Sequence, residues 1–169
     1  MYQILKLFFD ICLLKKGPQD FPASEWLFRL LIFVCALVDF SILMLSFDVF
    51  SAVIQTFVEI ILILGLTWII LYVAKRRGRY QQTVGALLAT DALISFMAFP
   101  AIALLLNDEA GLISFVITLL IIWHWVVSGH IFSHALEQPF TFGLGVAFLY
   151  ILVSMQVMAM LFPVIIMVE

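Results

Sequence analysis

The chain has 169 residues, of which 66% are hydrophobic and 11% are charged, and its formal net charge is −3. A soluble globular domain has about 45–50% apolar and about 25% charged residues, so this composition excludes that class and indicates one membrane domain. The acidic balance gives no reason to expect a nucleic-acid partner. The apolar runs are continuous rather than alternating, which favours membrane-spanning helices over a β-barrel.

The first segment, residues 2–16, is predicted to be a short helix that lies in the headgroup layer. It is too short to span a membrane, and a polar stripe follows one of its faces. The polar stripe consists of Gln3, Lys6 and Asp10. Lys15 and Lys16 stand near its C-terminal end, where they favour both the helix dipole and anionic lipid headgroups. Gly17 and Pro18 are expected to end this helix.

Five apolar stretches follow, and each is long enough for a helix that crosses the hydrocarbon core, which takes about 20 residues. They are expected at residues 25–46, 51–74, 81–106, 111–132 and 141–168. The predicted fold is therefore all-α, a polytopic membrane helix bundle with five transmembrane helices and a short N-terminal interfacial helix. Residues 1–24 form the interfacial helix and its linker, and residues 25–169 form the transmembrane domain.

The basic residues define the orientation. All eight fall on one side of the predicted bundle: Lys6, Lys15, Lys16, Arg29, Lys75, Arg76, Arg77 and Arg79. The connections on the other side carry only acidic charges, at Asp48, Asp108 and Glu109. Basic residues near span ends stay in the cytoplasm, so the N-terminus is predicted inside and the C-terminus outside. The short N-terminal segment and compact loops favour the cytoplasmic membrane of a bacterium.

The same basic residues are candidates for contacts with anionic lipid headgroups. These candidates are Lys15, Lys16, Lys75, Arg76, Arg77 and Arg79. Each such charge contributes about 1 kcal/mol near an anionic surface. Topology alone explains the basic run equally well, so both interpretations stay open.

Small residues and prolines mark special positions in the predicted spans. Two pairs with four-residue spacing, Gly85 with Ala89 and Gly143 with Ala147, indicate close approach between helices. Pro100 and Pro163 are each expected to kink a span in its outer half, because proline removes one hydrogen bond and crowds the preceding turn.

Four ionisable residues fall inside the predicted spans. They are Asp39, Glu59, Asp91 and His124. Each costs roughly 2.5–3.5 kcal/mol near the bilayer centre, so each is expected to face the bundle interior. Matching depths on neighbouring helices allow Asp39 to pair with Glu59, and Asp91 to pair with His124. The residues could form a proton or cation path, fix the register of the helices, or face a partner protein.

Three further residues could bind a metal ion near the cytoplasmic surface. His130, His134 and Glu137 would share one helix face if the helix continued that far, and such ligands suit zinc or iron. The alternative is that these histidines contact lipid headgroups. Cys12 and Cys35 have no partner at metal or redox spacing, so both are interpreted as small core residues.

Two segments carry a family resemblance. The stretches TVGALLATDALISFMAFP and WHWVVSGHIFSHALE occupy residues 83–100 and 123–137. Together with the five-span layout, they resemble the Yip1-like membrane proteins. That resemblance implies a non-enzymatic membrane protein whose eukaryotic relatives act in vesicle trafficking and bind small GTPases and one another. The N-terminal segment is far shorter here, which argues against GTPase binding.

Two functions follow as hypotheses. The first is a scaffold, accessory or regulatory subunit of a membrane assembly, working with a membrane-protein partner or as a homo-oligomer. The second is a proton-coupled or ion-conducting small transporter that uses the intramembrane acids. The sequence contains no constellation of catalytic residues and no motif for a cofactor, so an enzyme is not expected.

Overall fold

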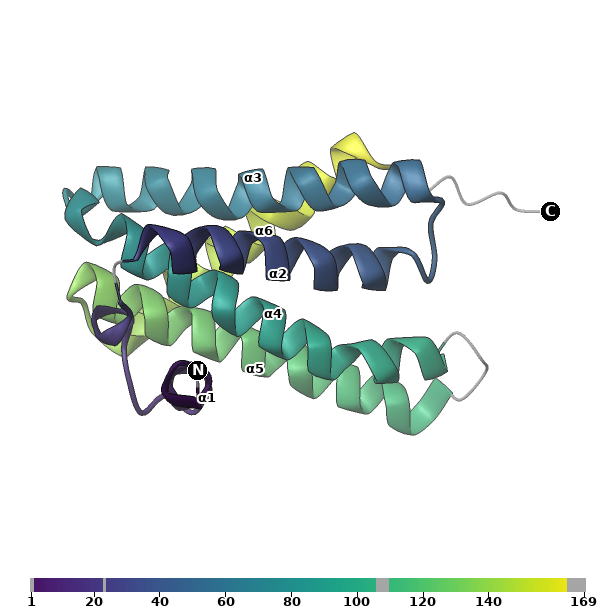
Figure 1. Ribbon diagram of the computed structural model, residues 1–169, viewed down its shortest axis with the longest axis horizontal. Helices are drawn as coiled ribbons and strands as arrows, with labels where there is room; N and C mark the ends of the chain where they lie inside the picture. The colour runs from purple at the N-terminus through teal and green to yellow at the C-terminus, as the bar shows by residue number, and fades with distance from the viewer. Residues whose placement is uncertain (1, 23, 106–109, 164–169) are drawn as a thin grey trace.

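A computed structural model describes residues 2–22, 24–105 and 110–163 of the chain. Regular structure in these residues is helical throughout (Figure 1). The α-helices are α1 (Tyr2–Cys12), α2 (Glu25–Leu43), α3 (Val49–Val73), α4 (Tyr80–Leu105), α5 (Ala110–Leu136) and α6 (Phe140–Leu161). Two 3₁₀ turns, η1 (Pro18–Asp20) and η2 (Arg77–Arg79), precede α2 and α4.

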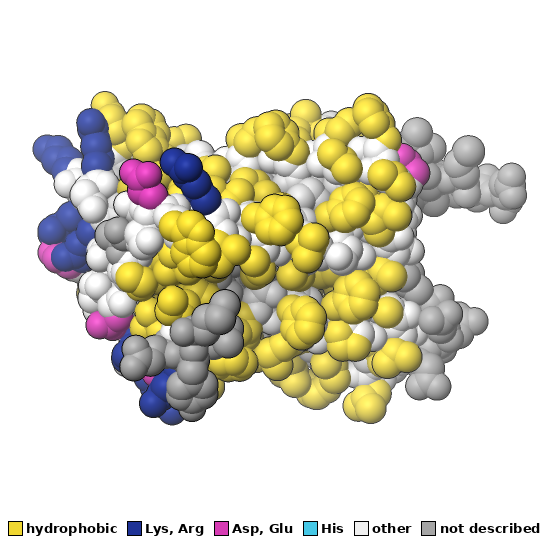
Figure 2. Space-filling model, viewed as in Figure 1, with side chains coloured by type: hydrophobic (Ala, Val, Ile, Leu, Met, Phe, Trp, Pro, Cys, Tyr) yellow, Lys and Arg dark blue, Asp and Glu magenta, His cyan; other side chains and the backbone are white. Residues whose placement is uncertain are grey.

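The five longer helices form the predicted membrane bundle. Each is long and apolar enough to cross a bilayer, and they run alongside one another (Figure 1). Hydrophobic side chains are spread along the face drawn in Figure 2, between its two ends. An apolar surface of that extent is stable only in lipid. The chain is therefore a multi-pass membrane protein whose outer surface contacts the bilayer.

The N-terminal helix is shorter than predicted. It ends at Cys12 rather than at residue 16, because Leu14 adopts a left-handed conformation with φ 61°. The amides of Lys15 and Lys16 then bond to the carbonyl of Asp10, which closes the end of the helix. Gly17 and Pro18 begin the 3₁₀ turn η1 instead of ending α1. Figure 1 shows α1 end-on, across the direction of α4 and α5.

Two span boundaries differ from the prediction by more than three residues. Helix α5 continues to Leu136 rather than to residue 132, and it ends where Glu137 adopts a left-handed conformation with φ 54°. Helix α6 ends at Leu161, so Pro163 follows the helix and does not kink it. Residues 164–168 of the predicted fifth span lie outside the described part of the chain. Helix α4 continues through Pro100.

Helix α4 forms the centre of the bundle. It contacts α1, α2, α3 and α5. All eight residues from Thr83 to Thr90 are buried, so this part of α4 has no lipid-facing side. Val127 and Ile131 of α5 are fully buried in the same hydrophobic core. The half of the bundle nearest the start of α4 is therefore close-packed.

The two predicted close approaches have different partners. A Cβ atom at Gly143 would lie 2.2 Å from the carbonyl oxygen of Gly129 and 2.7 Å from the amide nitrogen of Ser133. The backbones of α5 and α6 therefore touch at this point. A Cβ at Gly85 would instead lie 2.5 Å from the ring of Phe21. This notch on α4 holds a side chain of the linker, not another helix.

Side chains of the spans bond to the backbone of the N-terminal segment. Trp123 donates to the carbonyl of Cys12 at 3.0 Å, Gln82 donates to that of Phe21 at 3.3 Å, and a ring nitrogen of His130 lies 3.0 Å from that of Lys16. These three contacts hold the N-terminal segment against α4 and α5.

Burial raises the pKa of the Cys12 thiol to about 11, so this thiol stays neutral at physiological pH.

The charges gather at the ends of the bundle. Lys and Arg side chains cluster at one end in Figure 2, which we call the basic end. At the opposite end, Asp48 caps α3 by accepting a hydrogen bond from the Ser51 amide at 3.1 Å. Bonds from Ser51 lower the pKa of the Asp48 carboxyl. Asp108, Glu109 and Glu169 lie outside the described residues.

Candidate functional site

A cavity of about 540 Å³ lies between the membrane helices, and all five spans contribute polar side chains to its wall. We call it the acidic cavity. Its polar lining consists of Asp39 of α2, Glu59 of α3, Asp91 and Ser95 of α4, His124 of α5, and Tyr150 and Ser154 of α6. The remaining lining is aliphatic, apart from two methionines. The four intramembrane ionisable residues predicted from the sequence therefore line one space.

These residues lie at similar depths. Each ionisable group, and Tyr150, lies ten to fourteen residues from the end of its helix that is nearest the basic end. Tyr150 is ten residues from Phe140, the first residue of α6, and Asp39 is fourteen residues from Glu25, the first residue of α2. At about 1.5 Å per residue, this corresponds to roughly 15–21 Å from that end. The polar groups thus form a layer near the middle of the bundle.

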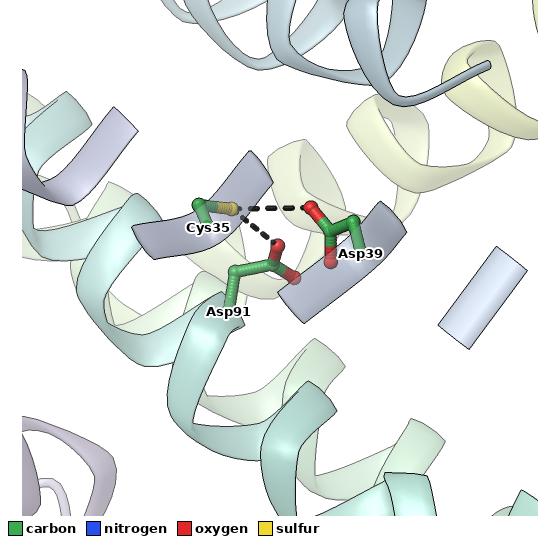
Figure 3. A group of neighbouring side chains, drawn as sticks. All are labelled: Cys35, Asp39 and Asp91. Atoms are coloured by element: carbon green, nitrogen blue, oxygen red, sulfur yellow. Dashed lines mark hydrogen bonds between the residues drawn. The ribbon is translucent and has the colours of Figure 1, made fainter. Parts of the chain in front are cut away.

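A thiol joins two of the carboxylates. The Sγ atom of Cys35 lies 3.2 Å from Oδ2 of Asp39 and 3.3 Å from Oδ2 of Asp91, and it can donate its proton to either (Figure 3). Cys35 and Asp39 are one helical turn apart on α2, whereas Asp91 comes from α4. Two carboxylates that share one thiol repel each other strongly at low dielectric. A proton or a cation between them removes that repulsion.

Asp91 links this cluster to His124. The second carboxylate oxygen, Oδ1, lies 3.5 Å from Nδ1 of His124, so the two form an ion pair when the imidazole is protonated. The Asp91 and His124 side chains are 21% and 29% exposed, and both line the acidic cavity. An ion in the cavity can therefore reach both groups.

Asp39 and Glu59 were predicted to pair directly, but in the structure Asp39 bonds to another residue. Among the hydrogen bonds of the described residues, Asp39 bonds to Cys35 of its own helix. Glu59 lines the same cavity from α3. Both acids therefore face one space, as the sequence suggested, but the immediate partner of Asp39 is the thiol.

Sequence reasoning missed Cys35 and Tyr150. Cys35 precedes Asp39 by four residues, and that spacing places both on one helix face; the signal was present, but Cys35 was interpreted only as a core residue. Tyr150 is only 9% exposed, and its ring packs 5.5 Å from that of Phe132. It continues the buried face of α6 that passes through Ala147, three residues earlier.

The cavity extends toward one side only. Its lining continues past the polar layer, away from the basic end, to Ile102, Ile117 and Met158. In the other direction lies the close-packed half of the bundle, which includes the buried residues Leu88 and Val127. A cation that arrives from the side opposite the basic end therefore meets the carboxylates before it meets the packed core.

No family model, curated protein or solved structure matches this chain. The resemblance to the Yip1-like proteins stays a prediction that rests on the two segments quoted above.

A second pocket, of about 640 Å³, lies at the basic end. His130 and His134 both line it, with ring centroids 4.3 Å apart, so they share a helix face. Glu137 also lines it, but its carboxylate forms ion pairs with Arg76 and Arg79. The carboxylate that was the third candidate ligand is thus held by two arginines.

The closest group of potential metal ligands lies elsewhere. In the described part of the chain, the ligand atoms of Cys35, Asp39 and Asp91 all lie within 4.8 Å of one another. The predicted ligands His130, His134 and Glu137 form no such group among the described residues. Asp39 and Asp91 of this group line the acidic cavity, and the buried Cys35 thiol contacts both of their carboxylates.

Proposed function

We propose that this membrane protein binds a cation in the acidic cavity and moves it across the bilayer. The supporting observation is that each of the five spans directs a polar side chain to one shared space in the middle of the bundle. Carboxylates there attract cations and repel anions. The proposal corresponds to the second of the two functions considered from the sequence, an ion-conducting transporter that uses the intramembrane acids.

The arrangement favours this function over a scaffold. Placing one ionisable residue near the bilayer centre costs roughly 2.5–3.5 kcal/mol, so the presence of several such residues in this small bundle requires an explanation. Fixing the register of two helices needs only one bonded pair, and contact with a partner protein needs side chains on the outer surface. Asp39, Glu59 and Asp91 instead line one shared cavity between the helices.

Movement of the cation requires a change of conformation. The acidic cavity extends away from the basic end, while the other half of the bundle is close-packed around residues 83–90 of α4. The structure therefore corresponds to a state that is closed toward the basic end. Release on that side requires α4 and α5 to separate from their neighbours, which makes the proposed protein a gated carrier or channel rather than an open pore.

The direct test is cation flux in liposomes that contain the purified protein. The Asp39→Asn variant should lose most of the flux, because it removes a cavity carboxylate while keeping the size of the side chain. Asp48→Asn is the matched control: it removes an exposed carboxylate on the same helical hairpin, and asparagine retains the ability to cap a helix. Internal dyes for protons and for divalent cations report the flux under an imposed membrane potential.

Two results would contradict the proposal. One is flux through the wild-type protein no greater than that through protein-free liposomes, with the protein shown to be folded and monodisperse. The other is an equal loss of flux in Asp39→Asn and Asp48→Asn, since that outcome would not involve the cavity.

We also propose the cytoplasmic membrane of a bacterium as the location, with the basic end in the cytoplasm. The support is the distribution of charge and the short connections between spans: α2 and α3 are joined by residues 44–48, and α5 and α6 by residues 137–139. Basic residues near span ends stay on the cytoplasmic side.

Anionic headgroups are the proposed partners of the basic end, and its residues differ in availability. Arg76 and Arg79 both pair with the carboxylate of Glu137, which offsets one of their two charges, whereas Lys15 and Lys16 are exposed and have no ion pair among the described residues. Replacing Lys15 and Lys16 by glutamine should weaken retention of anionic lipid in native mass spectrometry by about thirtyfold, at roughly 1 kcal/mol per charge. Replacing Arg76 and Arg79 by glutamine removes the same formal charge and should have a smaller effect. Equal effects of the two double variants would contradict this assignment.

A further inference from the structure

We propose that the cation is divalent and thiophilic, of the Zn²⁺ class, and that Cys35, Asp39 and Asp91 are its ligands. The inference rests on the proposed function, because it names the chemical class of ion that the acidic cavity takes. Two independent observations support it. One is the spacing of the three ligand atoms. The other is the acidic cavity, which Asp39 and Asp91 line, while the fully buried Cys35 thiol contacts both of their carboxylates.

The spacing fits a tetrahedral ion. Zinc binds cysteine sulfur at about 2.3 Å and carboxylate oxygen at about 2.0 Å, so a tetrahedral site holds sulfur and oxygen about 3.5 Å apart. In the structure the Cys35 sulfur lies 3.2 Å and 3.3 Å from the ligand oxygens of Asp39 and Asp91 (Figure 3). All three ligand atoms lie within 4.8 Å of one another, a spacing that one ion can bridge.

The donor set selects the class of ion. Mg²⁺ and Ca²⁺ prefer six or more oxygen ligands, and they gain nothing from a thiolate. A thiolate with carboxylates suits zinc and similar ions. Binding requires the Cys35 thiol to become a thiolate: the bond from sulfur to the ion replaces the S–H bond, and the proton leaves to water in the cavity.

The rest of the site suits reversible binding. Three protein ligands leave a fourth position of a tetrahedral ion open, whereas structural zinc sites fill all four. The Nδ1 atom of His124 lies 3.5 Å from Oδ1 of Asp91, the oxygen that Cys35 does not contact. In this position His124 orients the Asp91 carboxylate. An ion with an open position can exchange with water and leave through the acidic cavity.

The test is equilibrium binding to the full-length protein in detergent. Zn²⁺ should bind at one ion per chain in competition with a chromophoric chelator, and an excess of Mg²⁺ should not displace it. Co²⁺, used as a spectroscopic probe, should produce the near-ultraviolet absorption of a thiolate-to-metal charge transfer. That absorption should disappear in Cys35→Ser, which keeps a hydroxyl that can hydrogen-bond to Asp39 and Asp91.

Cys12→Ser is the matched control, because it changes the other buried thiol and leaves the cavity intact. Cys35→Ser should weaken Zn²⁺ binding by more than about tenfold, the loss that even outer hydrogen-bonding partners of metal ligands cause. Absence of Zn²⁺ binding, or equal binding by Cys35→Ser and the wild type, would overturn the inference.

The same preparations separate this inference from the proposed function. If liposomes show Asp39-dependent flux of other cations and the protein does not bind Zn²⁺, the metal assignment fails and the transport function stands. If Zn²⁺ binds through Cys35 but no cation crosses the membrane, the ligand assignment holds and the transport function is overturned. Uptake of Zn²⁺ that is lost in Cys35→Ser supports both.

Discussion

Replacing Gly143 by alanine is expected to destabilise the protein by about 1–3 kcal/mol, the usual cost of inserting a methyl group into a packed core. The added Cβ would lie 2.2 Å from the carbonyl oxygen of Gly129 and 2.6 Å from the Cβ of Ser133. The first of these contacts involves backbone, which cannot rotate away as a flexible side chain would. Helices α5 and α6 must therefore separate, and the contact between them is the most extensive in the bundle.

Gly145 provides the matched control, because it lies on the same helix two residues later and a Cβ there would meet nothing within 4 Å. Gly145→Ala should leave the unfolding temperature unchanged or raise it slightly, since alanine favours the helix. Thermal unfolding of both variants in detergent, followed by circular dichroism, gives the comparison. A similar unfolding temperature for the two variants would show that α5 and α6 do not touch at Gly143.

Asp91→Asn should reduce cation flux more than any other single change in the acidic cavity. Asp91 accepts from Cys35 through one oxygen and pairs with His124 through the other, so it is the residue that joins the cluster. Loss of a charged hydrogen-bonding partner costs about 1.5–3 kcal/mol, which corresponds to roughly a tenfold to hundredfold weaker affinity for the cation. Concentration dependence of flux in liposomes measures this change.

A double variant tests whether the two residues act together. Asp91 and His124 lie 3.5 Å apart, and residues in contact show non-additive effects. His124→Gln alone should lower the flux, and adding it to Asp91→Asn should have little further effect. Additive losses would indicate that His124 acts independently of Asp91. His130→Gln, on the same helix but at the basic end, is the control and should retain flux.

Much of the architecture could be predicted from local sequence patterns. A long apolar run must become a helix in lipid, because every backbone amide and carbonyl has to be bonded within the segment. That requirement is local, so the five spans could be placed within a few residues. The main errors concerned the positions at which helices end. Left-handed Leu14 ended α1 early, and Pro163 ended α6 where a kink had been expected. The end of a helix depends on the backbone conformation of one or two residues, and the spacing of apolar residues along the helix gives no information about that conformation.

The candidate site was predictable only in part. The cost of an ionisable group in lipid is a property of the residue and its depth, so Asp39, Glu59, Asp91 and His124 could be selected from the sequence alone. Nothing in the sequence determined the rotation of each helix about its axis. Rotation decides which side chains meet, and it is set by packing between helices, such as the backbone contact at Gly143.

The sequence by itself therefore determined the membrane class, the five spans, the side of the basic residues and the set of buried ionisable groups. These properties follow from composition, length and the cost of charge in lipid. Only the tertiary structure decided that the polar groups of all five spans line one cavity and that Cys35 links Asp39 to Asp91. Contacts between helices depend on the shapes of whole surfaces, and no local pattern of residues encodes them.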